Sequence, residues 1–291
     1  MKSATFGAPA LAGAIGLALT AGDAMADPPP AGPANGPYDW SGVYVGLNTG
    51  WTSFHSHADA STLTINQLSG VNNGTSTVTV PATTVTSKPQ GLTTSSWTGG
   101  GQVGFQKQLG HLVLGVEGDM DAVGGHSSGA SSYALPATAL TTGSTVSVDR
   151  FVNPQWDGSL RGRLGLALGR ALIYGTGGLA VADVHDATLY GYAPTVTSAV
   201  TAANPSTTFG PYAGYASNHS TLTGWTVGAG GEVALNRAVS VGLEYRYSDY
   251  GHATYGFETD APNSVSEAPR IGLIDNQVLA KINFRFGPGG F

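Results

Sequence analysis

Apolar and polar residues alternate with a period of two along much of this chain. Residues 239–248, VSVGLEYRYS, place Val, Val, Leu, Tyr and Tyr at every second position, with small, polar or charged residues between them. Because successive side chains of a β-strand point to opposite faces, such a segment has one apolar and one polar face. Eight segments are predicted to be strands on this pattern: residues 43–51, 96–106, 111–120, 156–168, 171–183, 221–235, 238–250 and 276–286.

The connections between the predicted strands differ greatly in length. Three are tight turns, near residues 109–110, 169–170 and 236–237, and four are long, at residues 54–94, 121–155, 184–220 and 251–275. The long connections are rich in Ser, Thr, Gly, Ala and Pro. Short turns at one rim and long loops at the other are typical of an outer-membrane barrel, in which the short turns lie in the periplasm.

Strands that cross a bilayer must close into a ring, because the hydrocarbon offers no water to the backbone N–H and C=O groups. The sequence therefore predicts an all-β fold, an eight-stranded antiparallel transmembrane up-and-down β-barrel with short periplasmic turns and long outer loops. Residues 75–85, TSTVTVPATTV, have strong β-propensity but lack a matching apolar face. These residues would extend a hairpin beyond the membrane or form a flexible loop. If they instead enter the membrane, a ten-stranded barrel is the alternative.

The few charged residues gather on one face of the predicted strands, and this face is predicted to line the lumen. A Lys or Arg turned to lipid at the midplane would cost about 2–4 kcal/mol. Since eight strands leave an interior that side chains fill, we expect an ion-pair network that closes the lumen; a narrow ion path is the alternative. The predicted members are Glu117, Asp119, Asp157, Arg161, Arg163, Glu232, Glu244, Arg246, Lys281 and Arg285, five acids and five bases. The facing of residues 171–183 stays open, because their apolar residues do not keep to one side.

The two ends of the chain do not continue the strand pattern. Lys2 precedes an uncharged stretch with an apolar centre at residues 8–21, and Ala24-Met25-Ala26 supplies a small-x-small cleavage site. This predicts a signal peptide at residues 1–26, cleaved after Ala26, with a buried N-terminal helix as the alternative. Residues 27–39 are predicted to be a Pro-rich periplasmic tether, residues 40–286 the barrel, and residues 287–291 a short tail.

Composition narrows the range of partners. Charged residues are 10% of the chain, against roughly 25% in an ordinary soluble domain. The net charge is −6 with only 12 Lys and Arg, so nucleic acid is not an expected partner. With no Cys, disulfides and zinc–thiolate sites are excluded. The expected partners are outer-membrane lipid, lipopolysaccharide and, during insertion, the barrel-assembly machinery.

Six segments in combination resemble a known family: WSGVYVGLNTGW (40–51), LVLGVEGDMDA (112–122), WDGSLRGRLGLALGRALIYGTGGLAVADV (156–184), GWTVGAGGEVAL (224–235), VSVGLEYRYSDYG (239–251) and NQVLAKINFRF (276–286). The chain is similar to the small outer-membrane β-barrel proteins of alphaproteobacteria, often labelled the porin family. The resemblance implies an eight-stranded barrel, an outer-membrane location and a surface or envelope-structural role. Haem binding and weak pore formation vary within that group. The chain departs from this group at the last strand, because such barrels usually end at an aromatic residue. Here Gly-Pro-Gly-Gly-Phe follows Phe286, and this leaves the register of the last strand open.

Histidines are the main candidates for ligand binding. Six of the seven are predicted at the outer end: His55, His57, His126, His185, His219 and His252. His55 and His57 share one face if their strand continues there, and neutral imidazoles bind transition metals or haem iron. The alternative is that these are ordinary polar residues of outer loops. Accordingly, His55 and His57 are named as a candidate ligand site, and no metal site or cofactor is predicted.

No arrangement of residues predicts catalysis. His126-Ser127 and His219-Ser220 are adjacent in sequence, but adjacency does not orient a base toward a hydroxyl, and no nucleophile elbow occurs. We therefore predict that the protein is not an enzyme but an outer-membrane barrel with an envelope-structural or surface role. The alternatives are a low-conductance porin for small solutes and an outer-surface protein that binds haem or another ligand. The sequence leaves the oligomeric state, the solute and any loop ligand undetermined.

Overall fold

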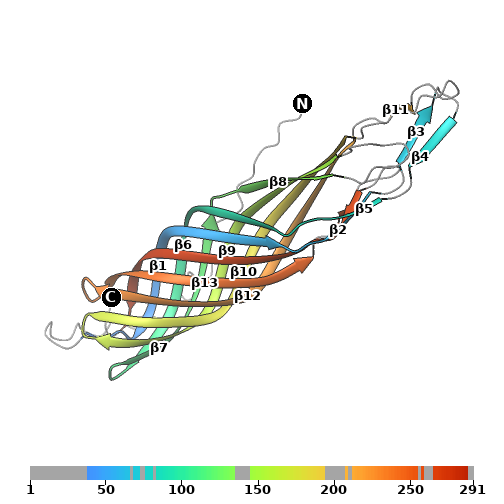
Figure 1. Ribbon diagram of the computed structural model, residues 1–291. Coiled ribbons are helices and arrows are strands. Elements are labelled where there is room, and N and C mark those ends of the chain that lie inside the picture. Colours follow the sequence, from blue (N-terminus) through green and yellow to red (C-terminus); the bar gives the residue numbers. More distant parts are fainter. Residues whose placement is uncertain are drawn as a thin grey trace, which may run out of the picture.

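The computed structural model describes residues 38–65, 68–72, 76–80, 83–134, 145–193, 207–208, 212–254, 257–258 and 265–287. The chain forms a long barrel of tilted strands, with two small sheets beyond one end (Figure 1). The predicted signal peptide, the tether as far as residue 37 and residues 288–291 of the tail lie outside the described residues. Among the residues described, no helix has the length and hydropathy needed to cross a membrane.

Eight strands form the ring: β1 (Gly42–Ala58), β6 (Gln90–Leu109), β7 (Leu112–Val123), β9 (Thr145–Leu168), β10 (Ala171–Ala193), β12 (Tyr212–Ala234), β13 (Val239–Thr254) and β16 (Arg270–Phe286). They pair antiparallel in the order β10-β12-β13-β16-β1-β6-β7-β9, and the pairing of β9 with β10 closes the ring. Each predicted segment lies within one of these strands or overruns it by one residue. The predicted eight-stranded antiparallel barrel is confirmed.

The first and last strands of the ring lie side by side. Val43 is opposite Phe286, and Trp51 is opposite Val278. This register answers the question that the C-terminal sequence left open, because β16 remains paired with β1 up to Phe286 and ends there.

The strands run farther outward than the sequence predicted. β9 begins at Thr145 rather than at residue 156, and β10 continues to Ala193 rather than ending at residue 183. β8 (Ser127–Ala134) pairs with the outer part of β9. The predicted bounds of the long loops at residues 121–155 and 184–220 were therefore too wide, because the prediction relied on apolar alternation. Outside the hydrocarbon a strand needs no apolar face, and strand pairing still satisfies its backbone N–H and C=O groups.

Two small sheets lie beyond the outer end of the ring (Figure 1). One joins β14 (Phe257–Glu258), β15 (Val265–Glu267), β2 (Thr62–Ile65) and β5 (Thr83–Thr86); the other joins β11 (Thr207–Thr208), β3 (Leu68–Asn72) and β4 (Ser76–Val80). Residues 75–85 therefore supply β4 and β5, and neither strand joins the ring. The ten-stranded alternative is wrong, and the prediction of a β-structured extension beyond the membrane is the one that matches.

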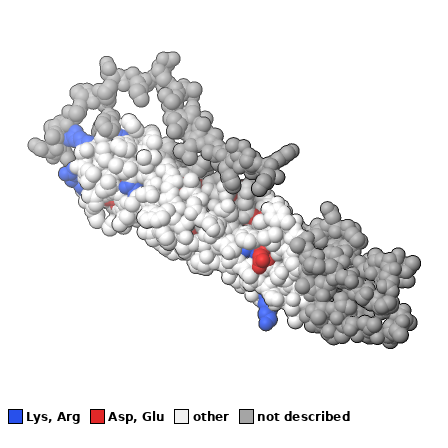
Figure 2. Space-filling view, turned by 90° about the horizontal axis from the view of Figure 1, so that it is seen from above, with Lys and Arg blue, Asp and Glu red and all other residues white. Residues whose placement is uncertain are grey.

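The two faces of the barrel wall differ sharply. In β1, Tyr44 and Asn48 point inward and are buried, whereas Val45 and Leu47 point outward and are exposed. The wall seen in Figure 2 is almost free of charged side chains, which appear toward its two ends. An exposed belt of aliphatic and aromatic side chains is the lipid-facing surface of an outer-membrane barrel.

Two apolar clusters occupy the interior, one near each end of the ring. The periplasmic cluster lies at the level of the short turns and contains Trp40, Val113, Ala167, Leu172, Tyr174 and Ala234. The outer cluster contains Phe54, Val123, Val152, Ala180, Ala182, Val184, Leu222, Tyr250 and Leu273. Between these clusters lie the charged side chains.

Candidate functional site

All ten charged side chains that were predicted to face the lumen lie inside the barrel. Each is almost completely buried: Glu117, Asp119, Asp157, Arg161, Arg163, Glu232, Glu244, Arg246, Lys281 and Arg285. They come from β7, β9, β12, β13 and β16, and ring closure joins residues as distant in sequence as Glu117 and Lys281. We call this set, with its hydrogen-bonding neighbours, the lumen network.

Arg161 is the centre of the lumen network. Its Nη2 donates to Glu117 Oε1 at 2.5 Å and to Asp119 Oδ2 at 2.8 Å. Its Nη1 donates to Glu244 and, at 3.1 Å, to the hydroxyl of Thr176. A guanidinium suits this position because it presents several donors in a rigid plane. One arginine thus joins three carboxylates from two different strands.

Lys281 bridges two of the same carboxylates. Its Nζ donates to Glu117 Oε1 and to Glu244 Oε2, both at 2.8 Å. Glu117 and Glu244 are therefore each shared between Arg161 and Lys281. Two acids and two bases form a compact neutral group, which satisfies charges that would be very costly to bury singly.

Arg246 connects this group to further acids. Its Nη1 donates to Asp119 Oδ1 at 2.9 Å and contacts Asp121 Oδ2 at 3.3 Å, while Asn48 donates to Asp121 Oδ1 at 2.7 Å. One carboxylate oxygen from each of Asp119, Asp121 and Asp157 lies within 4.8 Å of the others. Arg246 thus offsets the repulsion within a tight group of three acids.

Two acids that lie between the apolar clusters were missing from the predicted set, Asp121 and Asp275. The predicted strand boundaries placed both in outer loops, although Asp121 follows Glu117 and Asp119 at a spacing of two. Asp275 accepts a hydrogen bond from Thr52 Oγ1 at 2.6 Å. With these two, the acids between the apolar clusters number seven against five bases, where the sequence predicted five against five. Continued alternation after Glu117 and Asp119 is the signal that could have identified Asp121.

The facing of β10, which the sequence left open, is settled by its buried residues. Leu172, Tyr174 and Thr176 point inward, and Ile173 and Leu179 point outward. The Tyr174 hydroxyl donates to Glu244 Oε2 at 3.0 Å. The period was ambiguous because this strand places large, partly apolar side chains on both faces.

A tyrosine links Arg163 to the centre of the lumen network. Arg163 donates to Glu232 and, at 3.2 Å, to the hydroxyl of Tyr44. The same hydroxyl donates to Glu117 Oε2 at 2.7 Å. Glu232 also accepts from Asn283 at 3.0 Å and from Ser240. Neutral polar side chains therefore satisfy the oxygens that the cations do not reach.

Aromatic rings cover the lumen network at the periplasmic end. The guanidinium of Arg285 lies 4.5 Å from the centre of the Trp40 ring and donates to the Tyr38 hydroxyl at 2.5 Å. Burial raises the pKa of the Tyr38 phenol above its ordinary value, against the opposing charge of Arg285. The phenol therefore remains protonated at neutral pH. Trp40 donates through Nε1 to the carbonyl of Gly169 at 3.1 Å, which fixes its ring across the barrel mouth.

His55 and His57 share one face of β1, as the alternation predicted, and this face points outward. Both side chains are exposed. His57 Nε2 lies 3.7 Å from Asp59 Oδ1, and His55 Nδ1 lies 3.2 Å from the carbonyl oxygen of Ser53. Their role in ligand binding stays a prediction, and haem titration of His55→Ala/His57→Ala tests it.

The adjacent His219 and Ser220 point to opposite faces of β12. His219 lies on the outer wall, where its Nε2 is 2.6 Å from Asp183 Oδ1. Because neighbouring residues of a strand alternate in direction, the imidazole does not face the hydroxyl that follows it. This placement gives no base–nucleophile pair at these two residues.

The buried side chains are arranged in a definite order along the barrel axis. The lumen network fills the middle, and the apolar clusters lie on its periplasmic and outer sides. Farther out, Arg150 Nη2 pairs with Glu267 Oε2 at 3.0 Å. Charged side chains and apolar clusters thus follow one another along the interior of the described barrel.

Most of the chain is similar to known outer-membrane proteins. Residues 12–266 match the family model described as outer membrane protein beta-barrel domain. The 31 kDa outer-membrane immunogenic protein of Brucella melitensis is 29% identical over 258 residues, which are 84% of this chain and 88% of that protein. The 22 kDa outer membrane protein of Rhizobium leguminosarum is 32% identical over 163 residues, 55% of this chain and 56% of that protein.

Among solved structures, the outer membrane protein OprG from Pseudomonas aeruginosa aligns over 86% of this chain and 99% of its own, with a TM-score of 0.35 and 11% identity. The attachment invasion locus protein of Yersinia pestis aligns over 84% of this chain and 99% of its own, with a TM-score of 0.31 and 11% identity.

Proposed function

Because this chain belongs to the outer membrane protein β-barrel family, we propose that it is a closed barrel of the outer membrane with an envelope-structural and surface role, and that it does not conduct solutes. The observation that carries this proposal is the layered interior: a paired charge network lies between two apolar clusters. A water-filled lumen would be lined by polar groups that are free to exchange with solvent. Here the largest charged side chains, Arg161, Arg246 and Arg285, are fully buried among protein partners.

The lipid partners of this role are outer-membrane lipid and lipopolysaccharide, reached by the outward face of the wall. Trp51 and Trp97 lie opposite each other on β1 and β6, with ring centroids 5.7 Å apart, and both are exposed. Aromatic girdles of this kind mark the membrane interface in outer-membrane barrels. The barrel-assembly machinery is the proposed partner during insertion.

Single-channel conductance of the refolded mature protein, residues 27–291, in a planar bilayer tests the closed lumen. Refolding is verified beforehand by a heat-dependent shift on gels. We expect no conductance steps from the wild type. A positive control is Trp40→Ala/Leu172→Ala, which removes two large side chains of the periplasmic cluster, and Leu164→Ala on the outward face is the matched negative control.

Reproducible steps from the folded wild type that change in size in Arg163→Ala would show that the lumen conducts, and the low-conductance porin would then replace this proposal. The envelope role has its own test. Deletion of the coding sequence should sensitise cells to detergent and bile salts, and the wild-type protein should restore resistance. Unchanged sensitivity of the deletion strain would count against an envelope-structural role.

A further inference from the structure

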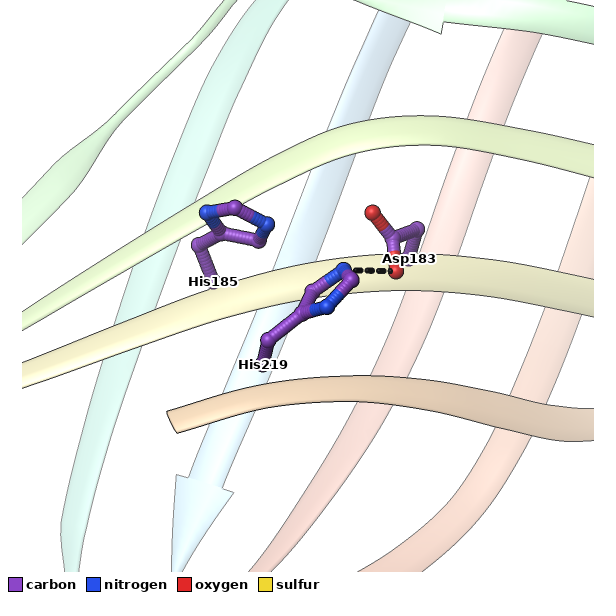
Figure 3. A group of neighbouring side chains, drawn as sticks. All are labelled: Asp183, His185 and His219. Atoms are coloured by element: carbon purple, nitrogen blue, oxygen red, sulfur yellow. Dashed lines mark ion pairs between the residues drawn. The ribbon is translucent and has the colours of Figure 1, made fainter. Parts of the chain in front are cut away.

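Three side chains with metal-binding atoms meet on the outer wall, away from the lumen network. Asp183 and His185 lie on the same face of β10, and His219 on β12 is directly opposite His185. Figure 3 shows the ring of His219 between the other two side chains in that view. Both histidines are expected from the sequence at the outer end, but only the register of β10 with β12 brings His219 beside His185 and Asp183.

The donor atoms of this cluster converge. His219 Nε2 lies 2.6 Å from Asp183 Oδ1, and the two imidazole rings have centroids 4.3 Å apart at an angle of 73°. One ligand atom from each of the three residues lies within 4.8 Å of the others. Tetrahedral zinc with bonds of about 2.0–2.2 Å holds its ligand atoms about 3.3 Å apart. Metal binding would require the exposed imidazoles to rotate so that the three donors reach that spacing.

Asp183 is the unusual member of the cluster. Although it lies on the outward face, its side chain is only 7% exposed. Within the described part of the chain, Asp183 Oδ1 is paired with His219 Nε2 but receives no hydrogen bond of regular geometry. A buried carboxylate oxygen without a hydrogen bond is costly. Because this oxygen lies beside the two imidazoles, a cation held among the three ligand atoms would give the buried carboxylate a counter-charge.

The cluster lies just beyond the lipid-facing belt. The outward residues that precede it on β10 include Leu179, and Trp225 on β12 is opposite Leu179; both are exposed and apolar. Level with the cluster the outward neighbours are polar, with Thr223 opposite Val181 and Thr221 opposite Asp183. The imidazole of His219 is 60% exposed. Ions from the external water therefore reach the cluster without crossing hydrocarbon.

We propose that Asp183, His185 and His219 form a binding site for a divalent transition-metal ion, Zn²⁺ in particular, on the external face of the barrel. Two imidazole nitrogens and one carboxylate are a common ligand set for such ions, whereas Mg²⁺ and Ca²⁺ prefer oxygen ligands alone. The coordination positions that point away from the wall are left to water. The three buried acids Asp119, Asp121 and Asp157 make no comparable site, because Arg246 already contacts two of them.

Isothermal titration of Zn²⁺ into the refolded mature protein without a polyhistidine tag tests the proposal. We expect saturable binding at one site per barrel. The variants His185→Ala/His219→Ala and Asp183→Asn should each weaken it by at least about tenfold, as loss of a ligand does. His126→Ala, an exposed histidine outside the cluster, is the matched control and should bind like the wild type. The heat-dependent gel shift verifies the fold of every variant.

Spectroscopy with Co²⁺ provides a second readout that does not depend on affinity alone. Bound to the wild type, Co²⁺ should give the visible absorption bands of nitrogen and oxygen coordination, and these bands should be lost in His185→Ala/His219→Ala. Absence of saturable Zn²⁺ binding by the folded wild type would overturn the proposal. So would binding that is equally strong in the double variant, because the metal would then sit elsewhere.

Discussion

The guanidinium carbon of Arg163 lies 3.6 Å from the centre of the Tyr174 ring. This stacking explains why Tyr174 faces the lumen on a strand whose sequence gives no clear period. The ring covers a buried cation, and its hydroxyl reaches Glu244 on β13. One aromatic residue therefore connects two acid–base groups and forms part of the periplasmic apolar cluster.

Replacement of Tyr174 should separate these two contributions. Tyr174→Phe keeps the ring over Arg163 but loses the hydrogen bond to Glu244, and we expect it to lower the free energy of unfolding by about 1 kcal/mol. Tyr174→Leu also loses the cation–π contact, worth about a further 0.5–2 kcal/mol. Urea unfolding in lipid vesicles, followed by tryptophan fluorescence, measures both. Equal stability of the two variants would contradict a role for the ring.

Removal of the central guanidinium should be the most damaging single change in the lumen network. Arg161→Met leaves Glu117, Asp119 and Glu244 short of a partner, and we expect a loss of about 3–5 kcal/mol in the free energy of unfolding. Arg170→Met, at an exposed periplasmic turn, is the matched control and should cost under about 0.5 kcal/mol. Adding Glu117→Gln to Arg161→Met should recover part of the loss, since it removes one negative charge from a group that has lost a cation. No recovery would show that burial of charge is not the cause.

The close approach of Gly104 to Tyr44 should make Gly104 intolerant of a side chain. A Cβ placed there would lie 2.3 Å from Tyr44 Cζ, whereas one at Gly118 would meet its nearest neighbour at 3.7 Å. We expect Gly104→Ala to displace the Tyr44 ring and cost about 1–3 kcal/mol in unfolding free energy, and Gly118→Ala to cost less. In a double-mutant cycle with Tyr44→Leu, the combined cost should be smaller than the sum of the single costs. Strict additivity would argue against the clash.

The lipid-facing belt should be sensitive to charge only within the membrane. Leu164 and Leu189 both point outward and are exposed, but Leu189 lies on the part of β10 beyond Asp183. We expect Leu164→Arg to cost about 2–4 kcal/mol in folding free energy and Leu189→Arg to cost little, since only the first charge enters hydrocarbon. The yield of heat-shifted protein after refolding into vesicles ranks the two. A similar loss for both variants would show that Leu189 also lies within the membrane.

Alternation along the chain was enough to predict the eight strands, the three tight turns and the inward side of ten charged residues. Each of these is a local consequence of strand geometry, because side-chain direction repeats every two residues whatever the strand pairs with. The same reasoning failed in strand segments that have no apolar face. It began β9 too late and ended β10 too early. In the same way it ended β7 before Asp121 and began β16 after Asp275, which left both acids in loops.

The sequence by itself determined the class of fold, the face of most strands and the residue types that line the interior. Only the tertiary structure decided which residues meet. Closure of the ring brings Lys281 to Glu117, and the register of β10 with β12 brings His219 to His185 and Asp183. The alternating direction of side chains along a strand follows from its own sequence. Which residues pair across strands depends on ring closure and on register. A shift of one residue in register would turn a strand's side chains to the opposite face.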